Sequence, residues 1–121
     1  EGGEPILEVG TSGTRKMISL IKSGGVIALM IDQAVKEGKY FKFLGRPAKT
    51  STSIAEISLK YNALLIPAYG IRRHDRRIGV TFDKPIELVT VSSITKEMNA
   101  SLEKRVKKYP TQWYWPHRRW K

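Results

Sequence analysis

The first hydrophobic pattern along the chain predicts a short amphipathic helix over residues 14–22. Its apolar side chains share one face at helical spacing: Met17, Ile18 and Ile21. Thr11 or Ser12 is placed to cap the start of this helix, and the pair of glycines at 24 and 25 ends it.

The continuous apolar run from Val26 to Ile31 predicts a strand that is buried on both faces. Such strands are typical of parallel α/β sheets. Residues 32–50 are mostly polar and contain two glycines and a proline, so they predict a long loop. A loop of this length inside a compact domain usually carries function.

A helix is expected next, from Ser53 to about Asn62. Ser53 and Glu56 have the spacing of a capping box, and Asn62 is a plausible stop. Residues 63–71 predict the following strand, in which Pro67 indicates an edge position, a bulge or a strand end.

The last third of the chain predicts a hairpin and a helix. Residues 72–77 form a basic turn into a strand over 78–82, which is typical of a β-hairpin. Residues 86–91 are short and extended. Ser93 or Thr95 then caps a helix that runs to about Tyr109, before Pro110. Its apolar face is Ile94, Met98, Leu102 and Val106.

This order predicts an α/β fold with a partly parallel mixed sheet and flanking helices in a single domain over residues 1–121. Strand, helix and strand through residues 26–71 form a right-handed crossover unit. Ligands of such sheets bind beyond the carboxyl ends of the strands. Asp32, Gln33 and the segment 69–73 occupy those ends.

The charge of the chain indicates what kind of partner it binds. The 121 residues contain 22 Lys or Arg against 11 Asp or Glu, a net charge of +11. A surplus of this size implies an anionic partner: nucleic acid, acidic lipid headgroups or phosphorylated small molecules. The absence of cysteine excludes a disulfide scaffold, a thiolate zinc site and a cysteine nucleophile. No apolar run is long enough to span a bilayer.

Few residues are good candidates for acid–base or metal chemistry. Asp32 follows the apolar run and can orient a polar group or cap a turn. His74 lies in a basic turn and His117 among Arg and Trp, and neither has a carboxylate at a spacing suited to a catalytic pair. No metal-ligand motif or glycine-rich phosphate motif is present in the sequence; the family resemblance described below likewise implies no metal and no bound cofactor.

The C-terminal tail from Pro110 to Lys121 is the most specific local feature, because all three tryptophans lie there among arginines. Such a segment suits the headgroup zone of an anionic membrane, where aromatic rings and basic side chains meet lipid. It also suits single-stranded nucleic acid, whose bases stack on rings. A third possibility is a tail whose rings pack onto the domain.

Four segments together resemble the C-terminal part of the lipid A biosynthesis acyltransferases, the lauroyl/myristoyl late acyltransferases of Gram-negative bacteria. They are Gly24 to Gln33, Phe43 to Thr50, Leu65 to Tyr69, and the ending Pro110-x-Gln112-Trp113-x-Trp115-x-His117-x-Arg119-Trp120. Leu44 departs from a usual Phe, and Thr111 from a usual acidic residue. The family's catalytic histidine, with an acidic residue after four intervening positions, has no counterpart here, since that position after His74 is Gly79.

The resemblance implies transfer of an acyl chain from acyl carrier protein to a hydroxyl of a lipid A precursor, with an upstream histidine as general base. The expected place is the cytoplasmic face of the bacterial inner membrane. The chain also lacks the family's N-terminal anchor, so it is expected to be a fragment that is inactive alone. The alternatives are a basic nucleic-acid-binding domain and a non-catalytic module at the membrane surface.

The resemblance also assigns roles to residues of this chain. No catalytic residue is expected in it. The expected substrate-binding residues are Asp32, Gln33, Phe43, Gly45, Arg46, Thr50, Arg72 and Arg73, with Pro47 and Lys49 beside them. The expected membrane contacts are Trp113, Trp115, Arg118, Arg119 and Trp120. Arg46, Lys49, Arg72 and Arg73 are candidates for contact with lipid phosphate or acyl carrier protein, because a guanidinium binds phosphate through two parallel hydrogen bonds.

Overall fold

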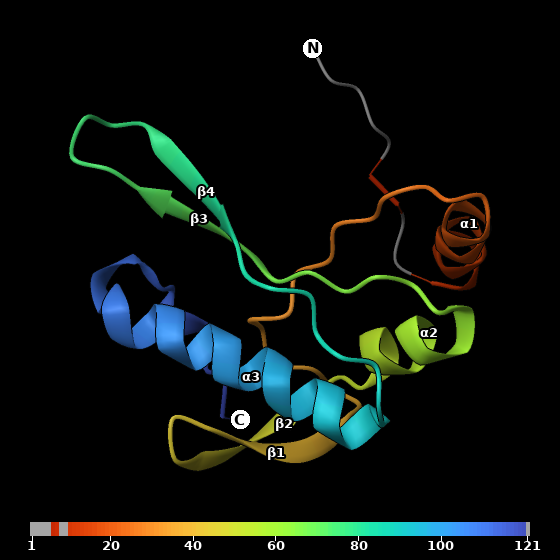
Figure 1. Cartoon of the computed structure of the whole chain (residues 1–121). Helices are drawn as coiled ribbons and strands as arrows, with labels where there is room; N and C mark the ends of the chain where they lie inside the picture. The colour runs from red at the N-terminus through yellow and green to blue at the C-terminus, as the bar shows by residue number, and fades with distance from the viewer. Residues whose placement is uncertain (1–5, 8–9, 121) are drawn as a thin grey trace.

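The computed structural model describes residues 6–7 and 10–120. The helices are α1 (Thr11–Lys22), α2 (Ser53–Tyr61) and α3 (Val91–Lys108). The strands are β1 (Lys39–Phe43), β2 (Arg46–Thr50), β3 (Ala68–Arg72) and β4 (Ile78–Phe82). Two short 3-10 helices follow, η1 (Pro110–Gln112) and η2 (Trp115–His117). In Figure 1, α3 crosses the molecule with the β1–β2 hairpin below it and the β3–β4 hairpin above it.

Both sheets of the described chain are antiparallel hairpins, in which β1 pairs with β2 and β3 pairs with β4. The α/β class is therefore confirmed, whereas the described residues show no parallel pairing. The expected crossover is absent because its first strand does not form. Residues 26–31 are extended but unpaired, and Val26 and Met30 are 95% and 80% exposed. A strand buried on both faces needs neighbours that the described residues do not supply.

The expected loop over residues 32–50 is wrong in its second half, which forms the β1–β2 hairpin. Phe43 lies opposite Arg46, so only Leu44 and Gly45 join the two strands. Their φ angles are 49° and 78°, and two positive φ values are what a tight type I′ hairpin turn requires. Leucine rarely adopts this conformation, which is why the sequence carries no strong turn signal here.

Helix α2 begins and ends near the expected residues, but its cap differs. The N-cap is Thr52, whose hydroxyl donates to Glu56 at 2.7 Å, so the expected Ser53–Glu56 capping box is not formed. Asn62 ends the helix in the left-handed conformation, with φ 48°. Pro67 lies directly before β3, which agrees with the expected strand end.

Helix α3 supplies half of the buried hydrophobic residues of the described chain. Its capping box is made by Thr90 and Ser93, so the expected cap at Ser93 or Thr95 lies too far along the chain. The predicted apolar face is confirmed, since Ile94, Met98, Leu102 and Val106 are all at most 5% exposed. The first half of α3 packs on α2, and the second half packs on the β1–β2 hairpin.

A polar network fixes the β3–β4 hairpin to α3. The hydroxyls of Tyr69 and Ser101 are 2.6 Å apart, and Ser101 donates to Asp83 at 2.7 Å. Arg105 binds the same carboxylate and lies over the Tyr69 ring. The hydrogen bond from Ser101 and the charge of Arg105 hold the pKa of Asp83 below its ordinary value, and burial raises the pKa of Tyr69.

Candidate functional site

Arg119 joins the C-terminal tail to the β1–β2 hairpin. Its side chain is fully buried and donates to the Lys49 carbonyl at 2.6 Å and to Thr50 Oγ1 at 2.8 Å. The guanidinium also lies over the Phe43 ring, 5.4 Å from its centre. The segments 43–50 and 113–120, which are far apart in sequence, therefore form one cluster.

The tail tryptophans complete this cluster. Trp113 and Trp120 pack against Phe43 with ring centres 5.4 and 5.7 Å apart, and the Trp120 indole donates to the Phe43 carbonyl at 3.1 Å. Arg46 covers the Trp120 ring from the outer side. Aromatic pairs of this geometry stabilise their contact beyond the area that they bury. Of the three rings, Trp115 is the most accessible, at 46% exposed.

Asp32 lies close to this cluster, and its negative charge affects the pKa of Arg119. Burial lowers the pKa of Arg119, and the nearby negative charge of Asp32 offsets part of that effect. Within the described residues, Asp32 Oδ1 and Arg119 Nε are both buried without a hydrogen-bond partner. The two groups thus interact through the field of their charges and not through a direct bond.

The structure separates the predicted site residues into three groups. One group is the tail cluster itself, which contains Asp32, Phe43, Arg46, Thr50, Trp113, Trp115, Arg119 and Trp120. A second group is exposed around it: Gln33, Gly45, Pro47 and Arg118. In the third group, Arg72 ends β3 and Arg73 follows it in the exposed turn before β4, and the Arg72 backbone is bonded to the Gln112 side chain of the tail.

Three of the expected site residues are buried in this structure. Arg119 is 0% exposed and its guanidinium binds Lys49 and Thr50 of the hairpin, so a membrane contact of this residue stays a prediction. Phe43 is 0% exposed and Thr50 is 5% exposed, so both pack inside the cluster, and their part in substrate binding stays a prediction. Residues that pack a site lie beside its contact residues in sequence, so a sequence motif does not distinguish the two roles.

Two polar residues of the cluster were missed from the sequence. Asn99 donates to the Lys42 carbonyl at 3.3 Å, and the backbone N–H of Leu44 donates to Glu103 at 2.6 Å. Asn99 carried a signal, because it lies on the buried side of α3 between Met98 and Leu102. A buried amide on a helix needs a partner on a neighbouring element.

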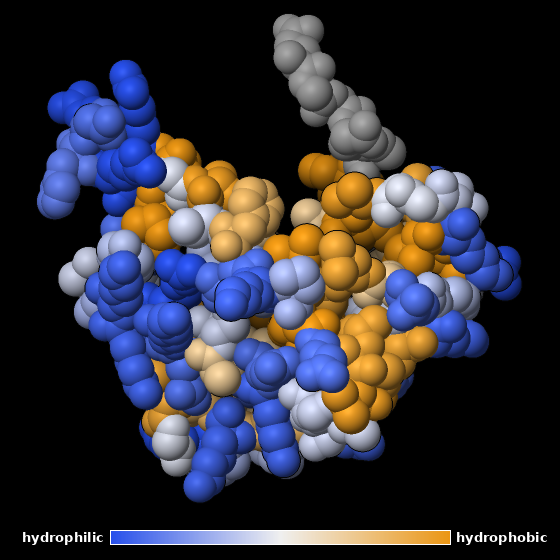
Figure 2. Space-filling model, viewed as in Figure 1, coloured by the Kyte–Doolittle hydropathy of each residue, from blue (hydrophilic) through white to orange (hydrophobic). Residues whose placement is uncertain are grey.

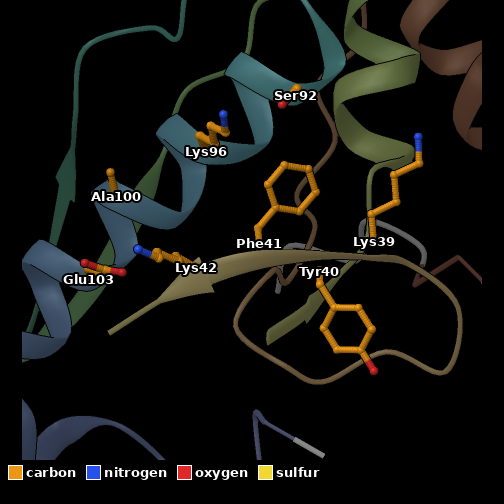
Figure 3. Close-up of a pocket in the computed structure, with 8 residues that line it drawn as sticks. All are labelled: Lys39, Tyr40, Phe41, Lys42, Ser92, Lys96, Ala100 and Glu103. Atoms are coloured by element: carbon orange, nitrogen blue, oxygen red, sulfur yellow. The ribbon is translucent and has the colours of Figure 1, made fainter. Parts of the chain in front are cut away.

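A groove of about 560 Å³ runs between β1 and α3. Figure 3 shows the Phe41 ring standing between Lys96 and Lys39, while Lys42 points toward Glu103 and Tyr40 points away. In the part of the chain that the structure describes, no carboxylate lies within ion-pair distance of Lys39, Lys42 or Lys96. An apolar ring flanked by unpaired ammonium groups suits a ligand with an anionic head and an apolar body.

Two other kinds of feature, a metal site and a membrane-spanning helix, are not found among the described residues. No group of histidine and carboxylate side chains there is placed to hold a metal ion. No helix in the described ranges is long and apolar enough to cross a bilayer. What the described residues offer is a set of basic and aromatic surfaces.

The family described as bacterial lipid A biosynthesis acyltransferase matches residues 8–121. The match covers nearly the whole chain and includes all of the segments that form the tail cluster. The chain therefore belongs to this family of lipid A acyltransferases. No curated protein matches it.

Proposed function

We propose that this chain is part of an acyltransferase that moves a lauroyl or myristoyl chain from acyl carrier protein to a lipid A precursor. In this reaction a precursor hydroxyl attacks the thioester carbonyl, an ester bond forms and the carbon–sulfur bond breaks. The hydroxyl proton passes to a general base and ends on the released thiol. No bound cofactor takes part in these steps.

The observation that carries the proposal is the contact between two of the family's motif segments, 43–50 and the C-terminal tail. Arg119 binds Lys49 and Thr50, and Trp120 binds Phe43, so the tail and the hairpin support each other. The net charge of +11 agrees with two anionic substrates, a phosphorylated lipid and an acidic carrier protein. The basic groove between β1 and α3 adds a surface suited to such partners.

The catalytic pair is proposed to lie outside these 121 residues. Neither histidine of the sequence is followed by an acidic residue at the family's spacing. The chain alone is therefore expected to be inactive, and the working enzyme is expected at the cytoplasmic face of the bacterial inner membrane. There its lipid acceptor and its soluble donor meet.

Steady-state kinetics of the enzyme that contains this chain test the proposal. Replacing Arg72 and Arg73 with Ala is expected to raise the KM for the phosphorylated acceptor and to leave kcat nearly unchanged. Replacing Arg15 and Lys16 of α1 removes the same charge from another surface and is the matched control. An unchanged KM in the first variant removes Arg72 and Arg73 from the acceptor site. Absence of any acyl transfer rejects the proposed function.

A further inference from the structure

Arg119 is the largest side chain that is fully buried in the described part of the chain. Charged side chains usually lie at the surface, where Figure 2 shows hydrophilic side chains gathered around α3. A buried charge is costly because it loses its contact with water, and even a paired one is weak evidence for stability. The burial of Arg119 therefore indicates a role beyond packing.

The guanidinium of Arg119 and the loop over residues 32–38 meet at the same two residues of β2. Arg119 donates to the Lys49 carbonyl at 2.6 Å and to Thr50 Oγ1 at 2.8 Å. Lys49 Nζ in turn donates to the Lys36 carbonyl of the loop at 2.8 Å. Lys49 and Thr50 thus connect the C-terminal tail to the loop that begins with Asp32.

Gly38 brings the end of this loop close to the same residues. A Cβ atom added at Gly38 would lie 2.5 Å from the Thr50 carbonyl oxygen, so only glycine allows the two backbones to approach this closely. The path of the chain from Asp32 to β1 is therefore fixed on the segment that Arg119 binds.

Asp32 adds a second link to Arg119, through charge. Its Oδ1 atom and Arg119 Nε are both buried and have no hydrogen-bond partner within the described residues. The negative charge of Asp32 favours the charged form of the buried guanidinium and so raises the pKa of Arg119 against the effect of burial. Because water screens buried charges less than exposed ones, the carboxylate is attracted toward Arg119.

We propose that Arg119 is a positioning residue, which orients the Asp32 carboxylate for its contact with the lipid acceptor. Arg119 does not touch the substrate in this arrangement, because its guanidinium is enclosed between Phe43 and Thr50. A polar group binds its ligand well only when the groups behind it fix its orientation. This inference rests on the proposed function and on the expected substrate-binding role of Asp32.

The chemistry of a carboxylate favours the lipid precursor as its substrate. In the proposed reaction the precursor reacts through a hydroxyl, and a carboxylate accepts hydrogen bonds from hydroxyl groups. A charged acceptor forms a stronger bond than a neutral one, provided that it is held in place. The tail thereby supports the acceptor site from behind.

A purely structural role for Arg119 predicts a different kinetic result. Loss of folded enzyme lowers the apparent kcat in proportion and leaves the KM of the remaining enzyme unchanged. Loss of an oriented substrate contact raises the KM for the lipid acceptor instead. KM does not depend on the amount of folded enzyme, so it separates the two roles even in variants of reduced stability.

Arg119→Met and Arg119→Lys in the intact enzyme provide the comparison. Both lose the planar fork, but only lysine keeps the positive charge that acts on Asp32. Arg119→Met is expected to raise the KM for the phosphorylated acceptor about tenfold, since a hydrogen bond to a charged group contributes at least that factor. Arg119→Lys is expected to raise it less than about threefold, although it is expected to be the less stable variant.

Arg15→Met is the matched control, because it removes one positive charge from exposed α1. It is expected to leave KM and kcat unchanged. Equal rises in KM for Arg15→Met and Arg119→Met would assign the effect to net charge and overturn the inference. An unchanged KM in Arg119→Met, or equal KM values for the lysine and methionine variants at position 119, would overturn it as well.

Asp32→Asn identifies the residue through which Arg119 acts. This variant alone is expected to raise the same KM about tenfold. Adding Arg119→Met to it is expected to raise KM by less than about twofold more, because the carboxylate that Arg119 orients is already gone. Rises that multiply in the double variant would show that the two residues act independently, and would overturn the inference.

Urea unfolding of the 121-residue chain tests the same pair without any acyl transfer. Arg119→Met is expected to increase the unfolding equilibrium constant at least about threefold less in the Asp32→Asn chain than in the unchanged chain, because interacting residues are not additive. Additive effects in the chain would overturn the inference even if the intact enzyme is active. If the unchanged enzyme transfers no acyl chain, the proposed function fails, and the chain still decides whether Arg119 acts on Asp32.

Discussion

Replacement of Arg119 by Lys tests whether the buried guanidinium holds the tail on the hairpin. The planar fork of Arg119 reaches two acceptors, the Lys49 carbonyl and Thr50 Oγ1, at 2.6 and 2.8 Å. A lysine keeps the charge but presents a single ammonium group without the fork. It therefore keeps the desolvation penalty of a buried charge and loses at least one of the two hydrogen bonds.

The magnitude follows from these contacts. A hydrogen bond from a charged donor contributes about 1.5–3 kcal/mol, and the contact with the Phe43 ring about 1 kcal/mol. Arg119→Lys is therefore expected to lower the free energy of unfolding by about 2–4 kcal/mol. Arg119→Met removes the buried charge as well as the bonds, so its loss is expected to be smaller, about 1–3 kcal/mol.

Urea unfolding followed by tryptophan fluorescence measures this loss, because Trp113 and Trp120 pack against Phe43 beside Arg119. Arg118→Lys is the matched control: it makes the same substitution one residue earlier, at an exposed side chain, and is expected to change stability by less than about 0.5 kcal/mol. Equal stability of the two lysine variants would refute the role given to Arg119, as would a better tolerance of Lys than of Met at position 119. Hydrogen exchange of residues 110–120 shows whether the loss is local to the tail.

Two further contacts give predictions of the same kind. The pKa of Asp83 is lowered from 3.8 by its hydrogen bond from Ser101 and by Arg105, so its stabilising effect is present above pH 3.8 and is lost as the pH falls through the lowered pKa. Asp83→Asn is therefore expected to lower the free energy of unfolding at neutral pH by about 1–2 kcal/mol. It is also expected to flatten the fall in stability at acid pH. An unchanged fall would show that Asp83 does not cause it. Gln112→Ala removes both side-chain bonds to Arg72 and is expected to raise amide exchange at residue 72 at least about fivefold, whereas Thr111→Ala, the neighbouring control, leaves it unchanged.

Elements whose apolar residues recur at a regular spacing were predictable from the sequence. Helix α3 shows this best, since its apolar residues recur at helical spacing and Pro110 follows its end. The β3–β4 hairpin was also expected, and the strand over 78–82 has the expected bounds. The helix was predicted from its helical spacing and the hairpin from its strand pattern and turn residues, and both signals are local properties of the chain.

Elements that depend on distant partners were not predictable. The apolar run 26–31 was expected to be a buried strand, but an apolar run does not specify what pairs with it. The β1–β2 hairpin was hidden by an unusual turn residue, Leu44. In both places the local pattern agreed with more than one structure, and contacts elsewhere in the chain decided between them.

The candidate site was likewise predictable only in part. The motif residues of the tail and of segment 43–50 were identified, and they do meet in one cluster. The burial of Arg119 was not foreseen, because its acceptors lie about 70 residues away in sequence and a charged residue in a basic tail is usually solvated. Sequence motifs thus indicated which residues matter, and only packing showed which of them face solvent.

Acyl transfer by the enzyme that contains this chain is the central claim. Mass spectrometry of the lipid acceptor measures this transfer directly. The intact enzyme, given acyl carrier protein loaded with a lauroyl or myristoyl chain and a phosphorylated lipid A precursor, is expected to add one ester-linked acyl chain. The 121-residue chain alone is expected to add none. An acceptor of unchanged mass after incubation with the intact enzyme and either donor would contradict the account.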